Sequence, residues 1–233
     1  VLLSRKVLAP MIDNMERQKQ FVTNAGHELK TPLAIISANA DVLELESGQS
    51  EWLRSIRHQT ARLEELIRNL LSMAKMEEQE TPLAFRTFSL SETAVDVAET
   101  FTTLAEANGL ALELDIQPEL TLNGNEEAIR QLISILMDNA IKYAAKSTLV
   151  TLRLKSRGRS GALLEVSNVC VQMPEGDLSR LFERFYRADA SRARQSGGYG
   201  IGLAIAQSIA QTHKAKISAR REEDQRICFA VSF

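Results

Sequence analysis

The chain has few of the residues on which several classes of protein depend. Its two cysteines, Cys170 and Cys228, are too few for a disulfide framework and lack metal-ligand spacing, which is typical of a reducing compartment. No apolar run approaches the roughly 20 residues of a membrane helix. The 28 basic residues nearly balance the 30 acidic ones, so bulk charge favours neither nucleic acid nor an anionic membrane. We therefore expect buried, unpaired cysteines, and any phosphate site must be local.

What is present suffices for a folded core. With 233 residues, 44% of them hydrophobic, the chain can form one large domain or two modest ones. It opens with VLLSRK, in which three apolar residues precede Ser4, Arg5 and Lys6. Basic residues favour the cytoplasmic end of a membrane span, so we expect such a span before residue 1. The alternative is a fragment of a longer soluble protein.

Residues 11–77 have the pattern of two long helices. Apolar side chains recur at steps of three, four and seven, which indicates an apolar stripe on each helix and a bundle seam. The stripe of the first helix comprises Val22, Leu29, Leu33, Ile36, Ala40 and Leu43, and that of the second Leu53, Ile56, Thr60, Leu63, Ile67, Leu70 and Ala74.

The segment ESGQSE, residues 46–51, predicts a short turn between these helices. Gly48 suits the end of the first helix, and Ser50 suits the N-cap of the second. The result is an antiparallel hairpin, which cannot cover both sides of its apolar stripe alone. We expect two chains to pair as a dimeric four-helix bundle, a homodimer. The alternative is that the second half of the same chain covers the stripe.

After a polar joint at residues 77–82 the pattern changes. Residues 110–116 and 149–154 alternate apolar and polar side chains, as half-buried strands do, whereas residues 126–144 and 202–213 have helical periodicity. Strands and helices mixed without regular βαβ repetition predict an α+β sandwich.

A glycine-rich loop, GGYGIGLAIA at 197–206, leads into the second of these helices. Backbone amides near glycines and at a helix start suit phosphate. In the other helix Asn139, Lys142 and Tyr143 share one face. The Asn139 amide oxygen can help to ligate Mg²⁺, and Lys142 can neutralise a phosphate. These features predict a nucleotide site, with the alternatives of a flexible loop and a solvated polar face.

In order and spacing, four segments together resemble the cytoplasmic core of bacterial sensor histidine kinases. FVTNAGHELKTPL is similar to the phospho-acceptor motif, LMDNAIKYA to the asparagine motif, LFERFYRADASR to the lid motif and GGYGIGLAIA to the second glycine motif. The resemblance implies a multidomain protein. Residues 1–80 would form the dimerisation and phosphotransfer hairpin, and residues 81–233 an ATP-binding domain of the fold shared by Hsp90, gyrase, MutL and the histidine kinases.

The resemblance makes His27 the phospho-acceptor. At about 100° per residue, His27 lies roughly 200° from Leu29 on the helix and so points away from the seam. A neutral imidazole is available as a nucleophile at cellular pH. The resemblance assigns Glu28 to orient or deprotonate the ring, and Thr31 to place a water that dephosphorylates the regulator. Pro32 predicts a kink beside His27, because it cannot donate the backbone bond to the Glu28 carbonyl.

The resemblance also implies which residues bind ATP. Arg187 in the lid motif would add positive charge, and the second glycine motif supplies Gly198, Gly200, Gly202 and Leu203. Asn168 stands where the family's first glycine motif has the aspartate that binds the adenine amino group, and its amide oxygen can still accept a hydrogen bond. The chain departs from the family at residues 169–172, which include no glycine, and at Ile135, where relatives often have a second asparagine.

The implied function is Mg²⁺- and ATP-dependent phosphorylation of His27, followed by transfer to an aspartate of a response regulator receiver domain, with a regulator phosphatase activity. The implied location is the cytoplasmic domain of a sensor anchored in the inner or plasma membrane, with no nucleic-acid partner. The departures from the motifs leave one alternative, a dimeric scaffold that binds a regulator but has little kinase activity.

Overall fold

A computed structural model of the chain describes residues 29, 32–46, 48, 50–77, 84–158, 161–187 and 200–233. Within 51–77, the side chains of residues 62, 65, 66 and 68–77 are outside the description. The chain divides into two compact units, residues 1–81 and 82–233. None of the described helices combines the length and hydropathy needed to cross a bilayer.

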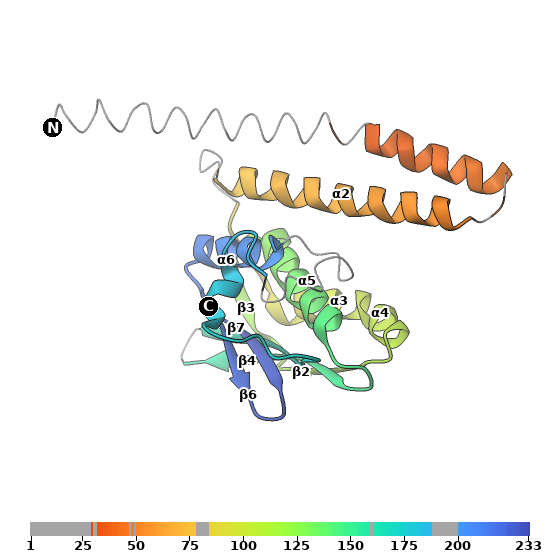
Figure 1. The fold of residues 1–233 in the computed structure, drawn as a ribbon. Coiled ribbons are helices and arrows are strands. Elements are labelled where there is room, and N and C mark those ends of the chain that lie inside the picture. The colour runs from red at the N-terminus through yellow and green to blue at the C-terminus, as the bar shows by residue number, and fades with distance from the viewer. Residues whose placement is uncertain are drawn as a thin grey trace, which may run out of the picture. The chain divides into compact units, whose positions relative to one another are not determined.

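The first unit contains a helical hairpin (Figure 1). Residues 32–46 are helical, and helix α2 spans Glu51–Glu77. Gly48 has φ +76°, a left-handed conformation that favours glycine. The Ser50 hydroxyl accepts a hydrogen bond from the Leu53 N–H at 3.1 Å, as an N-cap does. The predicted turn and its two capping residues are therefore confirmed.

The hairpin buries only half of its described apolar stripe. Five stripe residues are at most 9% exposed, and they repeat every seven residues: Leu33, Ala40, Leu53, Thr60 and Ile67. Five others are 43–52% exposed in the single chain, with the same repeat: Leu29, Ile36, Leu43, Ile56 and Leu63. One side of each helix thus packs within the hairpin, while the neighbouring side faces outward. We refer to the exposed set as the outer seam.

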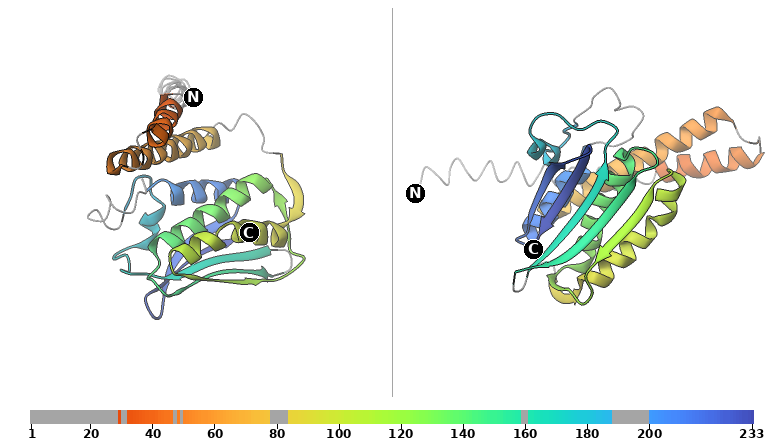
Figure 2. Two further views of the ribbon diagram at one scale, coloured as in Figure 1. Left: turned by 90° about the vertical axis from the view of Figure 1, so that its right-hand side faces the viewer. Right: turned by 90° about the horizontal axis from the view of Figure 1, so that it is seen from below.

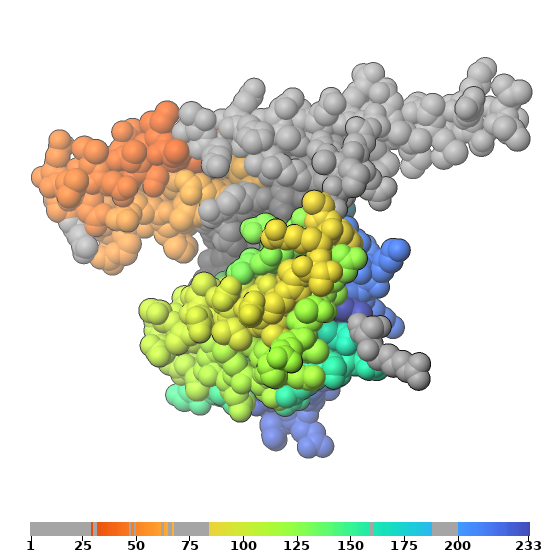
Figure 3. Space-filling view, turned by 180° about the vertical axis from the view of Figure 1, so that it is seen from behind, coloured from red at the N-terminus to blue at the C-terminus, as the bar shows by residue number. Residues whose placement is uncertain are grey.

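The second unit mixes helices and strands. In chain order its elements are β1 (Arg86–Ser89), α3 (Leu90–Thr100), α4 (Thr102–Ala107), β2 (Ala111–Ile116), β3 (Thr121–Gly124), α5 (Glu126–Tyr143), β4 (Leu149–Arg157), β5 (Gly161–Val169), the 3₁₀ helix η1 (Leu178–Phe182), α6 (Gly202–Thr212), β6 (Lys216–Glu222) and β7 (Arg226–Ser232). The predicted strands and helices are all present. From behind, residues of β1 to α5, coloured yellow to green, form much of the surface of this unit (Figure 3).

Five strands form one sheet in the order β2-β4-β5-β7-β6, in which β2 and β4 are parallel and the other pairs antiparallel. Strands β1 and β3 form a separate antiparallel pair. Helices α3, α5 and α6 lie on one face of the large sheet (Figures 1 and 2). This arrangement confirms the predicted α+β sandwich.

The period of two along the strands divides apolar from charged side chains. The core between sheet and helices contains fully buried residues from both layers, among them Ile129, Leu132, Leu136, Val150, Leu152, Leu154, Leu164 and Val166. On the opposite face, charged pairs cross the strands: Arg220 contacts Glu165 at 2.7 Å, and Arg153 contacts Asp115 at 3.0 Å. Even-numbered residues of β5 therefore face the helices, and Asn168 continues that row.

Candidate functional site

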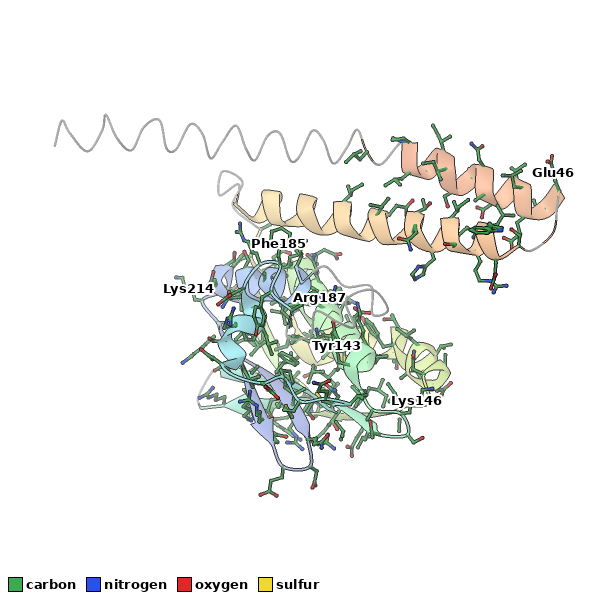
Figure 4. The ribbon with its side chains drawn as sticks, in the orientation of Figure 1. Glu46, Tyr143, Lys146, Phe185, Arg187 and Lys214 are labelled. Carbon is green, nitrogen blue, oxygen red and sulfur yellow. The ribbon has the colours of Figure 1, made fainter. Side chains whose placement is uncertain are left out.

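The last turns of α5 carry the three polar residues predicted to share a face. Asn139 and Lys142 are half-buried, whereas Tyr143 is 41% exposed. Tyr143 lies at the end of α5 (Figure 4). The Lys142 ammonium lies 5.9 Å from the centre of the Tyr143 ring, within range of a cation–π contact. The structure thus presents an amide, a cation and a phenol at one end of the helix.

The end of α5 is joined to the end of β5. At Ala144 the backbone becomes extended and pairs with Cys170 as an isolated β-bridge. The Ala145 N–H then donates to the Val169 carbonyl at 2.8 Å. The asparagine motif and the position of the first glycine motif, 29 residues apart from Asn139 to Asn168, therefore meet.

Asn168 is buried and only partly satisfied. Asn168 is only 1% exposed. The amide nitrogen donates to the Val169 carbonyl at 3.3 Å and lies 3.7 Å from the Cys170 sulfur. No group that the structure describes donates to the amide oxygen Oδ1. An unsatisfied buried acceptor costs about 1–3 kcal/mol, so its retention points to a ligand that supplies a donor. The amino group of adenine is such a donor, and Asn168 fits it.

Residues 169–172 include no glycine, and the segment that follows them is held by hydrogen bonds from β6 and by a cap on η1. The Arg221 guanidinium on β6 donates to the carbonyl of Pro174 and to that of Gly176, each at 2.7 Å. The Asp177 carboxylate caps η1 by accepting from the Ser179 N–H at 2.8 Å. Hydrogen bonds from Ser179 lower the pKa of Asp177 below its usual value. Sequence patterns could not single out Arg221, because the two residues whose carbonyls it binds are more than 40 positions away along the chain.

The base of the lid segment contacts the end of the glycine loop. The Phe185 N–H donates to the Gly200 carbonyl at 2.9 Å. Gly200 has φ +70°, and a Cβ added there would lie 2.6 Å from the Tyr186 carbonyl oxygen. A side chain at Gly200 would therefore force this contact apart. Arg187 follows directly and lies on the same segment as Phe185 (Figure 4).

Helix α6 starts at Gly202 without a side-chain cap among the described residues. Its first N–H groups therefore suit an anion, and Leu203 anchors this turn in the core. A Cβ on Gly202 would lie 3.4 Å from the Ile135 side chain. The Ile135 side chain therefore lies beside the start of α6.

His213 connects the two site helices at their other ends. Its Nε2 accepts from the Asn125 N–H at 3.0 Å, and its Nδ1 bonds to the Ile209 carbonyl at 2.8 Å. The ring stacks on Phe85 at 4.9 Å. A Cβ on Gly124 would lie 2.6 Å from the ring, so this packing requires glycine there. These contacts give His213 a structural role.

Several predicted residues lie outside the described part of the chain. These are His27, Glu28, Thr31 and Gly198. The kink predicted at Pro32 depends on the same stretch, although Pro32 itself begins the described helix over 32–46. Within the described residues there is no cluster of three or more His, Cys, Asp or Glu side chains able to hold a metal.

Comparison with known proteins assigns the chain to a family. Residues 17–79 match the His Kinase A (phospho-acceptor) domain, and residues 124–233 match the histidine kinase-, DNA gyrase B-, and HSP90-like ATPase. The sensor protein DltS of Streptococcus agalactiae is 36% identical over 223 residues, which cover 96% of this chain. The chain belongs to the sensor histidine kinases.

Two further sensor proteins are similar to this histidine kinase chain over most of its length. The sensor histidine kinase YkoH of Bacillus subtilis is 33% identical over 95% of the chain, and the phosphate regulon sensor protein PhoR of Pseudomonas aeruginosa is 31% identical over 87%. The chain spans about half the length of these relatives: 56% of DltS, 48% of YkoH and 46% of PhoR.

Solved structures share the fold. Full-length ShkA in complex with AMPPNP has a TM-score of 0.75 at 21% identity, covering 91% of this chain and 45% of ShkA. The histidine kinase AdeS of Acinetobacter baumannii has a TM-score of 0.64 at 20% identity, covering 89% of this chain and 96% of that one. The fold is therefore that of a histidine kinase core.

Proposed function

We propose that the chain phosphorylates itself on His27 from ATP and passes the phosphoryl group to an aspartate of a response regulator receiver domain. The observation that carries the proposal is the orphan acceptor of Asn168, buried where β5 meets the end of α5. An amino donor is the ligand group it lacks. AMPPNP, present in the ShkA structure, carries one on its adenine.

In this proposal the site residues divide by the part of ATP that they bind. Asn168 accepts from the adenine amino group. Lys142 and Arg187 neutralise phosphates, and Tyr143 lines the site from the exposed end of α5. The Asn139 amide oxygen is a candidate ligand for Mg²⁺, which prefers one or two protein oxygens plus phosphate. The loop with Gly198, Gly200, Gly202 and Leu203 presents backbone N–H groups at the start of α6.

The chemistry follows from a neutral imidazole and a good leaving group. A ring nitrogen of His27 attacks the γ-phosphorus, the bond from that phosphorus to the bridging oxygen breaks, and ADP leaves. Glu28 orients the ring and takes its proton. Mg²⁺, when bound, supplies charge neutralisation on the phosphates. The regulator aspartate then attacks the phosphorus and the P–N bond breaks, which regenerates His27. Thr31 positions a water for the phosphatase reaction, in which the acyl phosphate on the regulator is hydrolysed.

We further propose that residues 1–80 dimerise and carry the phospho-acceptor, while residues 81–233 bind ATP. The outer seam supports dimerisation, because five apolar side chains at heptad spacing are 43–52% exposed in one chain. A second hairpin would cover them as a four-helix bundle. The named relatives are sensor proteins, which supports a cytoplasmic domain of a membrane-anchored sensor.

The test is incubation of the whole chain with Mg²⁺ and γ-labelled ATP, beside His27→Gln and the matched control His58→Gln. His58 is an exposed histidine of the same hairpin. We expect acid-labile, base-stable label in the wild type and in His58→Gln, none in His27→Gln, and transfer of the label to a receiver domain. A folded, dimeric wild type that takes no label would favour the scaffold, whose supporting observation is the glycine-free segment 169–172.

A further inference from the structure

The amide of Asn168 is held in one orientation. An asparagine amide can either accept or donate, depending on which way it is turned, whereas a carboxylate can only accept. Here both described contacts of the amide are made by its nitrogen, to the Val169 carbonyl at 3.3 Å and to the Cys170 sulfur at 3.7 Å. The two N–H groups are thus engaged within the protein, and Oδ1 alone is left for a ligand.

The Val169 carbonyl cannot fix this orientation by itself. It already accepts a shorter bond, 2.8 Å, from the Ala145 N–H, and its contact with the Asn168 amide is the longer one. The Cys170 sulfur gives the second N–H a partner. It is also buried, at 5% exposure, and burial raises the pKa of the thiol, so the neutral form persists as a weak acceptor.

The base that the site selects depends on this orientation. Adenine presents an amino donor at its 6-position, whereas guanine presents a carbonyl acceptor there. The Asn168 oxygen, which lacks a described donor, can accept from the amino group of adenine and repels the carbonyl of guanine. If the amide turned over, its N–H groups would donate to the 6-carbonyl of guanine instead. A chain that has asparagine in place of aspartate therefore needs a group that prevents the turn.

We propose that Cys170 is a specificity-determining positioning residue: its sulfur holds the Asn168 amide nitrogen, which leaves the amide oxygen to accept from the ligand, and so sets the preference for a 6-amino over a 6-oxo purine nucleotide. This inference rests on the proposed function, since it concerns the same nucleotide site. It assigns a role to a side chain that stands where the family motif has glycine, which has no side chain to orient an amide.

The test is calorimetric titration of the whole chain with Mg-ATP and with Mg-GTP, which gives the ratio of the two dissociation constants. In Cys170→Ala we expect the preference for ATP to fall about tenfold, as loss of one orienting hydrogen bond predicts. Cys170→Gly should behave alike. The matched control is Cys228→Ala, which removes the other buried thiol, located on β7, and should leave the ratio unchanged.

Adding Asn168→Asp to Cys170→Ala separates positioning from packing. A carboxylate cannot donate in either orientation, so the double variant should recover the preference for ATP. A ratio that stays at the wild-type value in both Cys170→Ala and Cys170→Gly would overturn the inference, as would a lowered ratio that the double variant fails to restore. If the wild type binds ATP with an unchanged ratio across variants, only this inference fails. If it binds neither nucleotide, the proposed function fails with it.

Discussion

The two units of the chain are incomplete in opposite ways. The hairpin leaves apolar side chains without a partner: the outer seam residues are 43–52% exposed. The α+β unit has a closed core, and among its described residues the buried side-chain polar atom without a hydrogen-bond partner is Asn168 Oδ1, at the end of β5. An apolar stripe is completed by a like surface, whereas a buried acceptor is completed by a donor. The comparison explains why one unit is expected to bind a second copy and the other a small ligand.

The largest expected effect is on the hairpin. Ile36→Glu would place a charge in the outer seam of both copies, and burying an unpaired charge costs several kcal/mol. We expect the dimer dissociation constant to rise at least about a hundredfold by sedimentation equilibrium. Leu45→Glu is the matched control, since Leu45 is 87% exposed but lies off the stripe. If Ile36→Glu weakened the dimer no more than Leu45→Glu, the outer seam would not be the dimer interface, and the contrast between the two units would fail.

The next effect tests the α+β unit. Asn168→Leu has a similar shape and removes both the acceptor and its desolvation cost. We expect ATP affinity to fall about tenfold to a hundredfold, while the free energy of unfolding without ligand rises by about 1 kcal/mol. Urea unfolding and calorimetry measure the two quantities, and Asn168→Asp should retain ATP binding. If Asn168→Leu lowered stability instead, Oδ1 would have a partner already and the contrast between the units would fail.

The smallest effect concerns the closed core of the α+β unit. Burial raises the pKa of the Cys228 thiol from 9.0 to about 12. Between these values the unfolded chain has lost the proton that the folded chain keeps, so stability falls as pH rises. Relative to Cys228→Ala, the wild type should lose about 1 kcal/mol per pH unit above pH 9 in reducing urea titrations. Below pH 9 the difference should be constant. If the free energies of unfolding of the wild type and Cys228→Ala differed by the same amount at every pH, the Cys228 thiolate would be tolerated in the core and this prediction would be wrong.

Local patterns predicted the helical hairpin with its turn, and two helices and two strands of the α+β unit. The helices expected at 126–144 and 202–213 end within a residue of α5 and α6, and the turn uses the two residues expected of it. These features depend on periodicity and capping, which involve neighbours in the chain. The parallel pairing of β2 with β4, the β1–β3 pair and helix α4 were not predicted, because strand partners are chosen by tertiary packing.

For the candidate site, motif order predicted which segments come together but not the contacts of individual atoms. Motif order indicated that residues 139–143 and Asn168 serve one site, and the bridge from Ala144 to Cys170 joins their elements. What remained hidden is the state of individual atoms. That Oδ1 of Asn168 lacks a donor, or that Arg221 binds two loop carbonyls, follows from contacts between distant segments. Residue type alone cannot reveal these contacts.

The most direct test of the central claim is to locate the phosphoryl group. The chain would be incubated with Mg-ATP, digested with trypsin at neutral to mildly basic pH, and the peptide of residues 20–30 fragmented in a mass spectrometer. This peptide contains Thr23 as well as His27. We predict one phosphoryl group, on His27, that disappears after brief acid treatment. A phosphoryl group on Thr23, or an unmodified peptide from a chain that binds ATP, would contradict the account.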